Sequence, residues 1–258
     1  MSLVLNAHDA GFFSTSTIIL FEIINYYKKN DCYPKIINSS KVFTWYKKNK
    51  NCDIFSDFFK IQNLKNFDIK MFTNFNYDSR GDLQFEKYID HNLDIYFEFV
   101  NIYFNLSDEV INIYNNLINK YNIDFDNICC LFLRGNDKVK ECNIPEYSNY
   151  ITEGEKILTI NPNLKFLIQS DEKEFIDEMY VNFPNNIVFN DEIRTISKNT
   201  KLTVDNHGFN PESNYFFAKN FLAIVNIMSK CKYVICNTGN ISFWILMYRK
   251  NLNNYIQL

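Results

Sequence analysis

Two positive charges and one negative charge stand close together in the segment Arg134-Gly135-Asn136-Asp137-Lys138, directly after an apolar run. A guanidinium group can hold two phosphate oxygens at once, and a glycine lets a ligand or a backbone approach closely. Asp137 is placed to orient either cation. The segment is therefore a candidate phosphate-binding site, although a solvated turn with an Arg134–Asp137 ion pair explains the same residues equally well.

A second candidate anion site is the segment Asn237–Ser242, which joins an apolar run to the start of a predicted helix. Free N–H groups at a helix start, aided by the helix dipole, bind anions without a basic side chain. Thr238 and Ser242 add hydroxyl donors, so the predicted phosphate contacts are Thr238, Gly239, Asn240 and Ser242. Ordinary helix capping by Asn240 or Ser242 is the alternative.

Polar residues also follow two other predicted strands. Ser170-Asp171 could bind a ribose or a base, or Asp171 could cap the next helix. His8, Asp9 and Gly11 follow the first strand and could face a second domain across a cleft.

The second half of the chain alternates apolar runs with helix-length segments, which indicates α/β layers. We predict strands over 127–134, 165–170, 186–190 and 232–237, and helices over about 146–159, 171–180, 213–229 and from Asn240 onward. In an open α/β sheet, ligands bind at the carboxyl ends of the strands. That rule selects 134–138, 170–171 and 237–242, which should all fall at one edge of the same sheet.

The first half has weaker patterns. We predict strands over 2–7 and 35–40, with a helix between them that Ser14, Thr15 or Ser16 would cap. Residues 41–102 are predicted as helices and loops, and residues 107–121 as a helix. We place a domain boundary at 121–127, which gives an N-terminal domain over 1–124 and a C-terminal domain over 125–258.

Composition excludes several classes of protein. The net charge of −3 and the pI near 5.7 speak against a nucleic-acid partner. No apolar run approaches the roughly 20 residues that a membrane span needs. Seven cysteines, an odd number with no close pair at metal-ligand spacing, favour a reducing cytoplasm. No Cys/His set has metal-site spacing, and Asp124-Phe125-Asp126 precedes a strand instead of following one, so we predict no metal.

Four segments, in order, resemble the C-terminal half of α1,6-fucosyltransferases and bacterial nodulation fucosyltransferases. They are LFLRGNDKVKE, IPEYSNYI, FLIQSDEKEFIDE and MSKCKYVICNTGNISFWI. The early AGFFSTSTIILFEII, which contains Gly11, is similar to the loop and helix that open the N-terminal domain of related families. The resemblance implies an α/β protein of GT-B type, with two Rossmann-like doubly wound domains that face a cleft. It also implies metal-independent, inverting transfer of fucose from GDP-fucose. The N-terminal domain over 1–124 would then be the acceptor-side domain, and the C-terminal domain over 125–258 would be the nucleotide-sugar-binding domain.

The resemblance assigns roles to individual residues. Arg134 matches the arginine that holds the donor diphosphate, and Asp137 and Lys138 match the acid and lysine that follow it. Tyr147 matches a tyrosine near the next helix, and Asp171 matches the acid after the second strand. Residues 237–240 fall on the phosphate-facing turn.

The chain departs from the family pattern at four positions. Gly135 replaces a second arginine, and Phe132 replaces a histidine that contacts guanine. Cys142 replaces the proposed catalytic acid, with Glu141 one residue away. Ile224 stands near the position of an aspartate that reads guanine. These departures concern the base of the donor and the group that activates the acceptor.

We therefore predict an inverting glycosyltransferase that moves fucose from GDP-fucose to a hydroxyl of a glycan or glycoprotein, with no cofactor besides this donor substrate. Arg134, Lys138 and the helix start at Asn240 would stabilise the leaving diphosphate. Glu141, and then Asp9, are the candidate bases. Two alternatives remain: a related transferase that uses a different nucleotide sugar, and a nucleotide-sugar-binding protein without activity.

Overall fold

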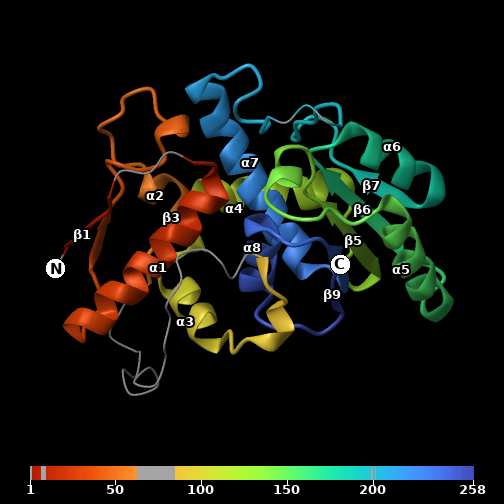
Figure 1. Cartoon of the computed structure of the whole chain (residues 1–258), viewed down its shortest axis with the longest axis horizontal. Coiled ribbons are helices and arrows are strands. Elements are labelled where there is room, and N and C mark those ends of the chain that lie inside the picture. The colour runs from red at the N-terminus through yellow and green to blue at the C-terminus, as the bar shows by residue number, and fades with distance from the viewer. Residues whose placement is uncertain (1, 7–9, 63–84, 199, 201) are drawn as a thin grey trace.

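A computed structural model describes residues 2–6, 10–62, 85–198, 200 and 202–258. Its C-terminal half contains one sheet of five parallel strands in the order β7-β6-β5-β8-β9 (Figure 1). The chain adds β6 and β7 on one side of β5 and then returns to add β8 and β9 on the other side. The strands are β5 (Ile128–Leu133), β6 (Lys165–Ser170), β7 (Asn186–Val188), β8 (Tyr233–Cys236) and β9 (Tyr255–Gln257).

Helices cover both faces of this sheet because β5 is apolar on both faces. Side chains of a strand alternate between its two faces. Cys129, Leu131 and Leu133 pack in one hydrophobic cluster with α5 (Tyr147–Ile160) and α6 (Lys173–Asn182). The intervening residues Ile128, Cys130 and Phe132 pack in the other with α7 (Pro211–Lys230) and α8 (Asn240–Arg249). The predicted doubly wound arrangement is therefore present in this half.

In the N-terminal half, the described strands form two separate pairs. The parallel pair is β1 (Ser2–Val4) and β2 (Ile36–Asn38), joined by α1 (Phe12–Asn30). The antiparallel pair is β3 (Phe59–Lys60) and β4 (Asn105–Leu106). The helices that accompany them are α2 (Phe55–Phe58), α3 (Asp94–Tyr103) and α4 (Asp108–Tyr121).

The start of α1 differs from the sequence-based expectation. The helix begins at Phe12 with Gly11 as its N-cap, ahead of Ser14, Thr15 and Ser16. The hydroxyls of Thr15 and Ser16 instead donate to main-chain carbonyls of the preceding turn, at 3.3 Å and 2.9 Å. The prediction that one of these three residues caps the helix is therefore wrong. The correction places Gly11 at a helix N-terminus.

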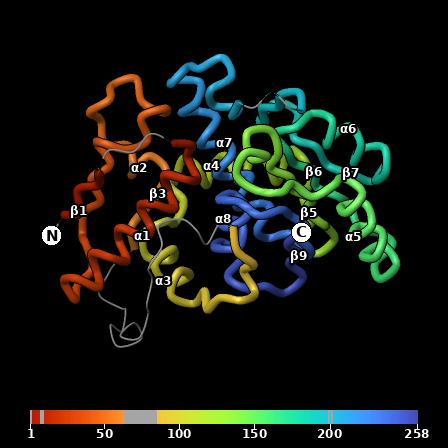
Figure 2. Tube along the Cα trace, viewed as in Figure 1, coloured from red at the N-terminus to blue at the C-terminus, as the bar shows by residue number. Residues whose placement is uncertain are grey.

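One hydrophobic cluster extends through both halves, and its members include residues of α1, α3, α7 and α8. At its centre the indole of Trp244 donates to Thr17 Oγ1 at 2.9 Å and to the carbonyl of Phe13 at 3.2 Å. The trace in Figure 2 shows the segment that precedes α3 (yellow) beside the C-terminal segment (blue), and there the Tyr88 amide donates to Gln257 at 2.9 Å. The halves thus share a core, and the division at residues 124 and 125 stays a prediction.

Candidate functional site

A cavity of about 310 Å³ lies at the carboxyl ends of β5 and β6. This edge is the switch point of the sheet, where the chain reverses its order of strand addition, and such points bind ligands in open α/β folds. The N-terminal turns of α1 and α8 and a loop at 203–205 complete the wall. The lining includes the predicted residues Gly11, Arg134, Asp137, Lys138, Glu141, Asp171 and Asn240.

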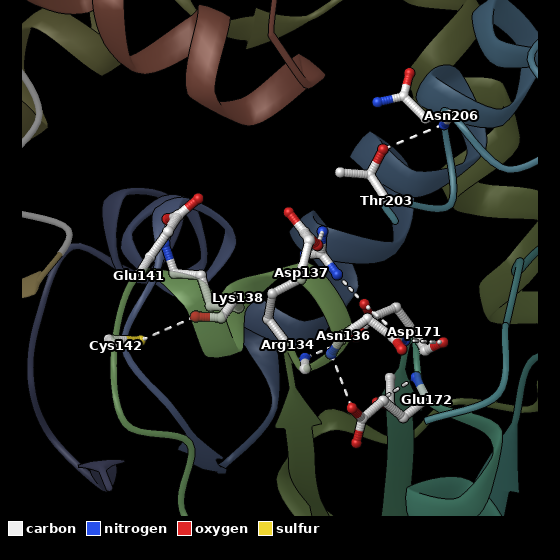
Figure 3. Close-up of polar contacts among 12 residues, drawn as sticks. Arg134, Asn136, Asp137, Lys138, Glu141, Cys142, Asp171, Glu172, Thr203 and Asn206 are labelled. Carbon is white, nitrogen blue, oxygen red and sulfur yellow. Dashed lines mark hydrogen bonds and ion pairs between the residues drawn. The ribbon is translucent and has the colours of Figure 1, made fainter. Parts of the chain in front are cut away.

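Arg134 is fixed at the cavity by its backbone and by its side chain. Its amide donates to the side chain of Asn237 at 2.9 Å, and the Asn237 amide group donates back to the Arg134 carbonyl at 2.8 Å. Its guanidinium is hydrogen-bonded to Asp137 and to Asp171 (Figure 3). The side chain remains 16% exposed. The result is a guanidinium held in one orientation at the cavity wall.

Asp171 and Glu172 bind the turn after β5 and thereby shape it. Asp171 accepts from the Gly135 amide at 2.8 Å, and Glu172 accepts from the Asn136 amide at 2.8 Å (Figure 3). Asp171 therefore lines the cavity without capping α6, whose N-cap is Glu172. Tyr147 is not among the described residues that line the cavity. Its hydroxyl instead donates to Glu172 at 2.6 Å, so it supports the turn from behind.

Gly135 has no space for a side chain. A Cβ atom at this position would lie 2.2 Å from the carboxyl carbon of Glu172, which is 1% exposed. The second arginine of the family resemblance therefore has no room here in the presence of Glu172.

Lys138 reaches the cavity from the 3₁₀ helix η7 (Asn136–Lys140) and passes close to the β8–α8 turn. A Cβ atom on Gly239 would lie 3.4 Å from Lys138 Cε, and Gly239 has a φ of 151° that a larger residue rarely adopts. Lys138 Nζ pairs with Glu141 at 2.6 Å. The structure thus brings Arg134, Lys138 and the start of α8 together.

Of the residues predicted in the β8–α8 turn, only Asn240 at the start of α8 lines the cavity. The helix has the glycine Gly239 as its N-cap. Thr238, Gly239 and Ser242 are not among the lining residues in the described part of the chain. Thr238 accepts from Gln257 at 3.0 Å, the Gly239 carbonyl accepts from Tyr88 at 3.1 Å, and Ser242 is fully buried.

Of the residues predicted at the junction between β1 and α1, the structure describes only Gly11. Gly11 lines the cavity at the start of α1, where the hydroxyl of Tyr46 accepts from the Phe12 amide at 2.7 Å. Asp9, the second candidate base, and His8 lie outside the described residues.

The cavity is also lined by residues that the sequence patterns did not indicate, among them Trp45, Gln169, Arg194, Asp205, Phe217 and Phe221. Gln169 Oε1 and Asp205 Oδ1 are buried acceptors without a hydrogen-bond partner among the described residues. Gln169 could have been suspected, because it stands near the end of a predicted strand. Asp205 gave no signal, because the loop at 191–211 has no periodic pattern.

Asp205 lies in an environment that combines burial with nearby cations. Burial raises the pKa of its carboxyl group above the usual value of 3.8. A hydrogen bond from Tyr46 and the charges of Arg134 and Arg194 lower the pKa in part, and the charge of Asp137 raises it. Burial also raises the pKa of Tyr46 well above its usual value, so this hydroxyl remains a donor.

Comparison with solved structures identifies the fold. The chain is similar to NodZ α-1,6-fucosyltransferase soaked with GDP-fucose, with a TM-score of 0.56, 12% identity, and coverage of 95% of this chain and 91% of that chain. For fucosyltransferase NodZ from Bradyrhizobium, the TM-score is 0.55 at 12% identity, with 90% and 87% covered. For NodZ co-crystallised with GDP, it is 0.54 at 10% identity, with 94% and 90% covered.

The chain thus has the fucosyltransferase-like GT-B fold. No protein-family model matches it, and no curated protein matches it in sequence. Among the described residues, no group of three or more His, Cys, Asp or Glu side chains could hold a metal ion. No helix in the described ranges is both long and apolar enough to cross a membrane.

Proposed function

We propose that this protein is an inverting glycosyltransferase that takes its sugar from a nucleotide diphosphate donor, with fucose from GDP-fucose as the preferred donor. The observation that carries the proposal is the convergence of Arg134, Lys138 and the start of α8 on one cavity at the switch point of the sheet. The fold of NodZ, a fucosyltransferase solved after soaking with GDP-fucose, supports the choice of donor.

In this proposal the diphosphate lies against Arg134, Lys138 and the N-terminal turn of α8. When the bond from the sugar to the diphosphate breaks, negative charge develops on the leaving oxygen, and cations fixed in advance stabilise it. Arg134 is well suited to this task because its two acidic partners hold the guanidinium in place. Asp171, Asp137 and Tyr147 then act on the arginine and its turn, while an acceptor glycan approaches from the side of α1.

A different nucleotide sugar is the alternative donor, and one observation favours it. Phe132 lines the cavity where the family resemblance expects a histidine that contacts guanine. Ile224, near the position of the guanine-reading aspartate, is fully buried. Recognition of the base would then fall to other lining residues, of which Gln169 offers a buried acceptor oxygen without a partner among the described residues.

Isothermal titration calorimetry with GDP, UDP and ADP tests the donor site. We expect Arg134→Ala to weaken binding of the preferred diphosphate by about 1.5–3 kcal/mol, the usual contribution of a hydrogen bond to a charged group, or about 10- to 150-fold in Kd. Lys156→Ala, which removes an exposed cation from α5, is the matched control and should bind normally. Unchanged binding by a folded Arg134→Ala variant would refute the proposed donor site.

A further inference from the structure

The carboxyl group that activates the acceptor is the part of this reaction that the family resemblance leaves without a residue. We propose that Asp205 is the general base of the transfer, with Oδ1 as the atom that takes the proton from the acceptor hydroxyl. This inference rests on the proposed function, and it replaces Glu141 in the role that the sequence predicted.

The loop that carries Asp205 is held in place over the cavity. The amides of Asn206 and His207 donate to the Thr203 carbonyl at 3.1 Å and 3.0 Å. The side chain of Asn214, which is almost fully buried, donates to the Asp205 carbonyl at 3.0 Å. Arg194 donates in turn to Asn214 at 2.6 Å. Figure 3 shows Thr203 and Asn206 on this loop, across the cavity from Asp137 and Arg134.

The two carboxyl oxygens of Asp205 have different surroundings. Tyr46 accepts from the Phe12 amide, and hydrogen bonding from its hydroxyl lowers the pKa of the Asp205 carboxyl group in part. Oδ2 lies near Gly11, at 3.9 Å from the position that a Cβ atom on Gly11 would occupy. Oδ1 is buried and has no hydrogen-bond partner among the described residues. A buried oxygen of this kind normally receives a hydrogen bond. In this proposal the hydroxyl group of the bound acceptor glycan supplies that hydrogen bond.

Glu141 is less suited to the same role. Its carboxylate pairs with Lys138 at 2.6 Å, and its side chain is 45% exposed. The ion pair with Lys138 therefore already engages the Glu141 carboxylate. No ion pair engages Asp205 in the described part of the chain, and burial raises its pKa despite the nearby Arg134 and Arg194. A raised pKa brings a carboxylate closer to the working pH, which is what a general base needs.

The transfer forms one bond at the anomeric carbon and breaks another. The acceptor oxygen forms a bond to the anomeric carbon, and the bond from that carbon to the diphosphate oxygen breaks. The bonding electron pair leaves with the diphosphate, whose charge meets Arg134 and Lys138. The acceptor proton passes to Asp205 Oδ1 and then to solvent after the product leaves. Water can replace the acceptor, which gives free sugar and the nucleoside diphosphate.

Hydrolysis of GDP-fucose tests this step without knowledge of the acceptor. The rate of GDP release is measured from pH 4 to 9 for the wild type, Asp205→Asn and Glu141→Gln, with Asp177→Asn on the exposed face of α6 as the matched control. We expect Asp205→Asn to lower the rate by about 100-fold or more, the usual contribution of a positioned base. Its GDP affinity should stay within about threefold, and the fall in rate at acid pH should disappear. Glu141→Gln should retain that acid fall.

The other outcomes refute different parts of the proposal. A normal rate and a normal acid fall in Asp205→Asn would refute the role of Asp205 alone. Loss of both the rate and the acid fall in Glu141→Gln would likewise exclude Asp205 as the base. A rate loss that is matched by an equal loss of GDP affinity would show that Asp205 binds the donor instead. A wild type that binds no GDP, or that binds it without turnover, would refute the proposed function itself, and the role of Asp205 with it.

Discussion

Replacing Gly135 with alanine should destabilise the fold at the turn that carries Arg134. The added Cβ would lie 2.2 Å from the carboxyl carbon of Glu172, whereas ordinary contacts begin at 3.4 Å. The carboxyl group would therefore have to move by about 1 Å, in an interior too densely packed to absorb the change. It cannot move freely, because it accepts hydrogen bonds from the Asn136 amide and from Tyr147.

The expected cost follows from these contacts. Crowding of a packed interior costs about 1–3 kcal/mol, and a lost hydrogen bond to a charged group costs about 1.5–3 kcal/mol. Because part of the strain is relieved when a bond breaks, the two costs do not add fully. We expect the free energy of unfolding to fall by roughly 2–4 kcal/mol, measured by urea denaturation at pH 7.

A double-mutant cycle isolates the clash. In a Glu172→Ala background the obstructing carboxyl group is absent, so Gly135→Ala should cost less than about 1 kcal/mol there. Gly11→Ala is the control, because its added Cβ would meet the nearest atoms at 3.9 Å and its φ is −59°. If Gly135→Ala costs less than about 1 kcal/mol in the wild type, or the same in both backgrounds, Glu172 is not what requires a glycine at this turn.

Two further predictions concern the acidic residues. Glu141→Gln removes one ion-pair partner of Lys138. Partly exposed pairs contribute about 0–1 kcal/mol, so GDP should bind up to about fivefold more tightly by calorimetry and turnover should fall less than tenfold. Weaker GDP binding would contradict this. Asp205→Asn should raise Tm by about 2–4 °C at pH 7.5 and by less at pH 4.5. Burial raises the folded-state pKa of Asp205, so the wild type loses stability as pH rises through that pKa, and the variant does not. An equal Tm shift at both pH values would show that charge is not the cause.

The sheet of the C-terminal half was predictable because its signals are local. The apolar run of β5 is long enough to specify a buried parallel strand, and polar residues after β5, β6 and β8 mark one edge. The convergence of Arg134, Lys138 and Asn240 follows from that topology. The start of α1 was not predictable from its hydroxyl residues, because Thr15 and Ser16 can donate to carbonyls of the preceding turn as readily as such residues cap a helix.

Long-range contacts explain what the sequence did not indicate. Tyr147 was expected at the donor, yet its hydroxyl donates a hydrogen bond to Glu172, which is far from it in sequence. Asn214 holds the loop of Asp205 through its main-chain carbonyl, and Tyr46 acts on its carboxyl group. No local sequence pattern indicates either contact. In the sequence Gly135 indicates only a flexible turn. The structure shows that the buried Glu172 leaves no space for a side chain at this position.

Proton NMR tests most directly whether the cavity binds a nucleotide sugar. In this measurement GDP-fucose is incubated with the protein in a buffer that contains EDTA. We predict that the donor is consumed, that GDP appears, and that the fucose formed first has the anomeric configuration opposite to that of the donor. We also predict that Arg134→Ala slows this reaction strongly while Lys156→Ala does not. A donor that persists unchanged beside folded protein, with no binding of GDP, UDP or ADP by calorimetry, would contradict the proposal that the cavity binds a nucleotide sugar.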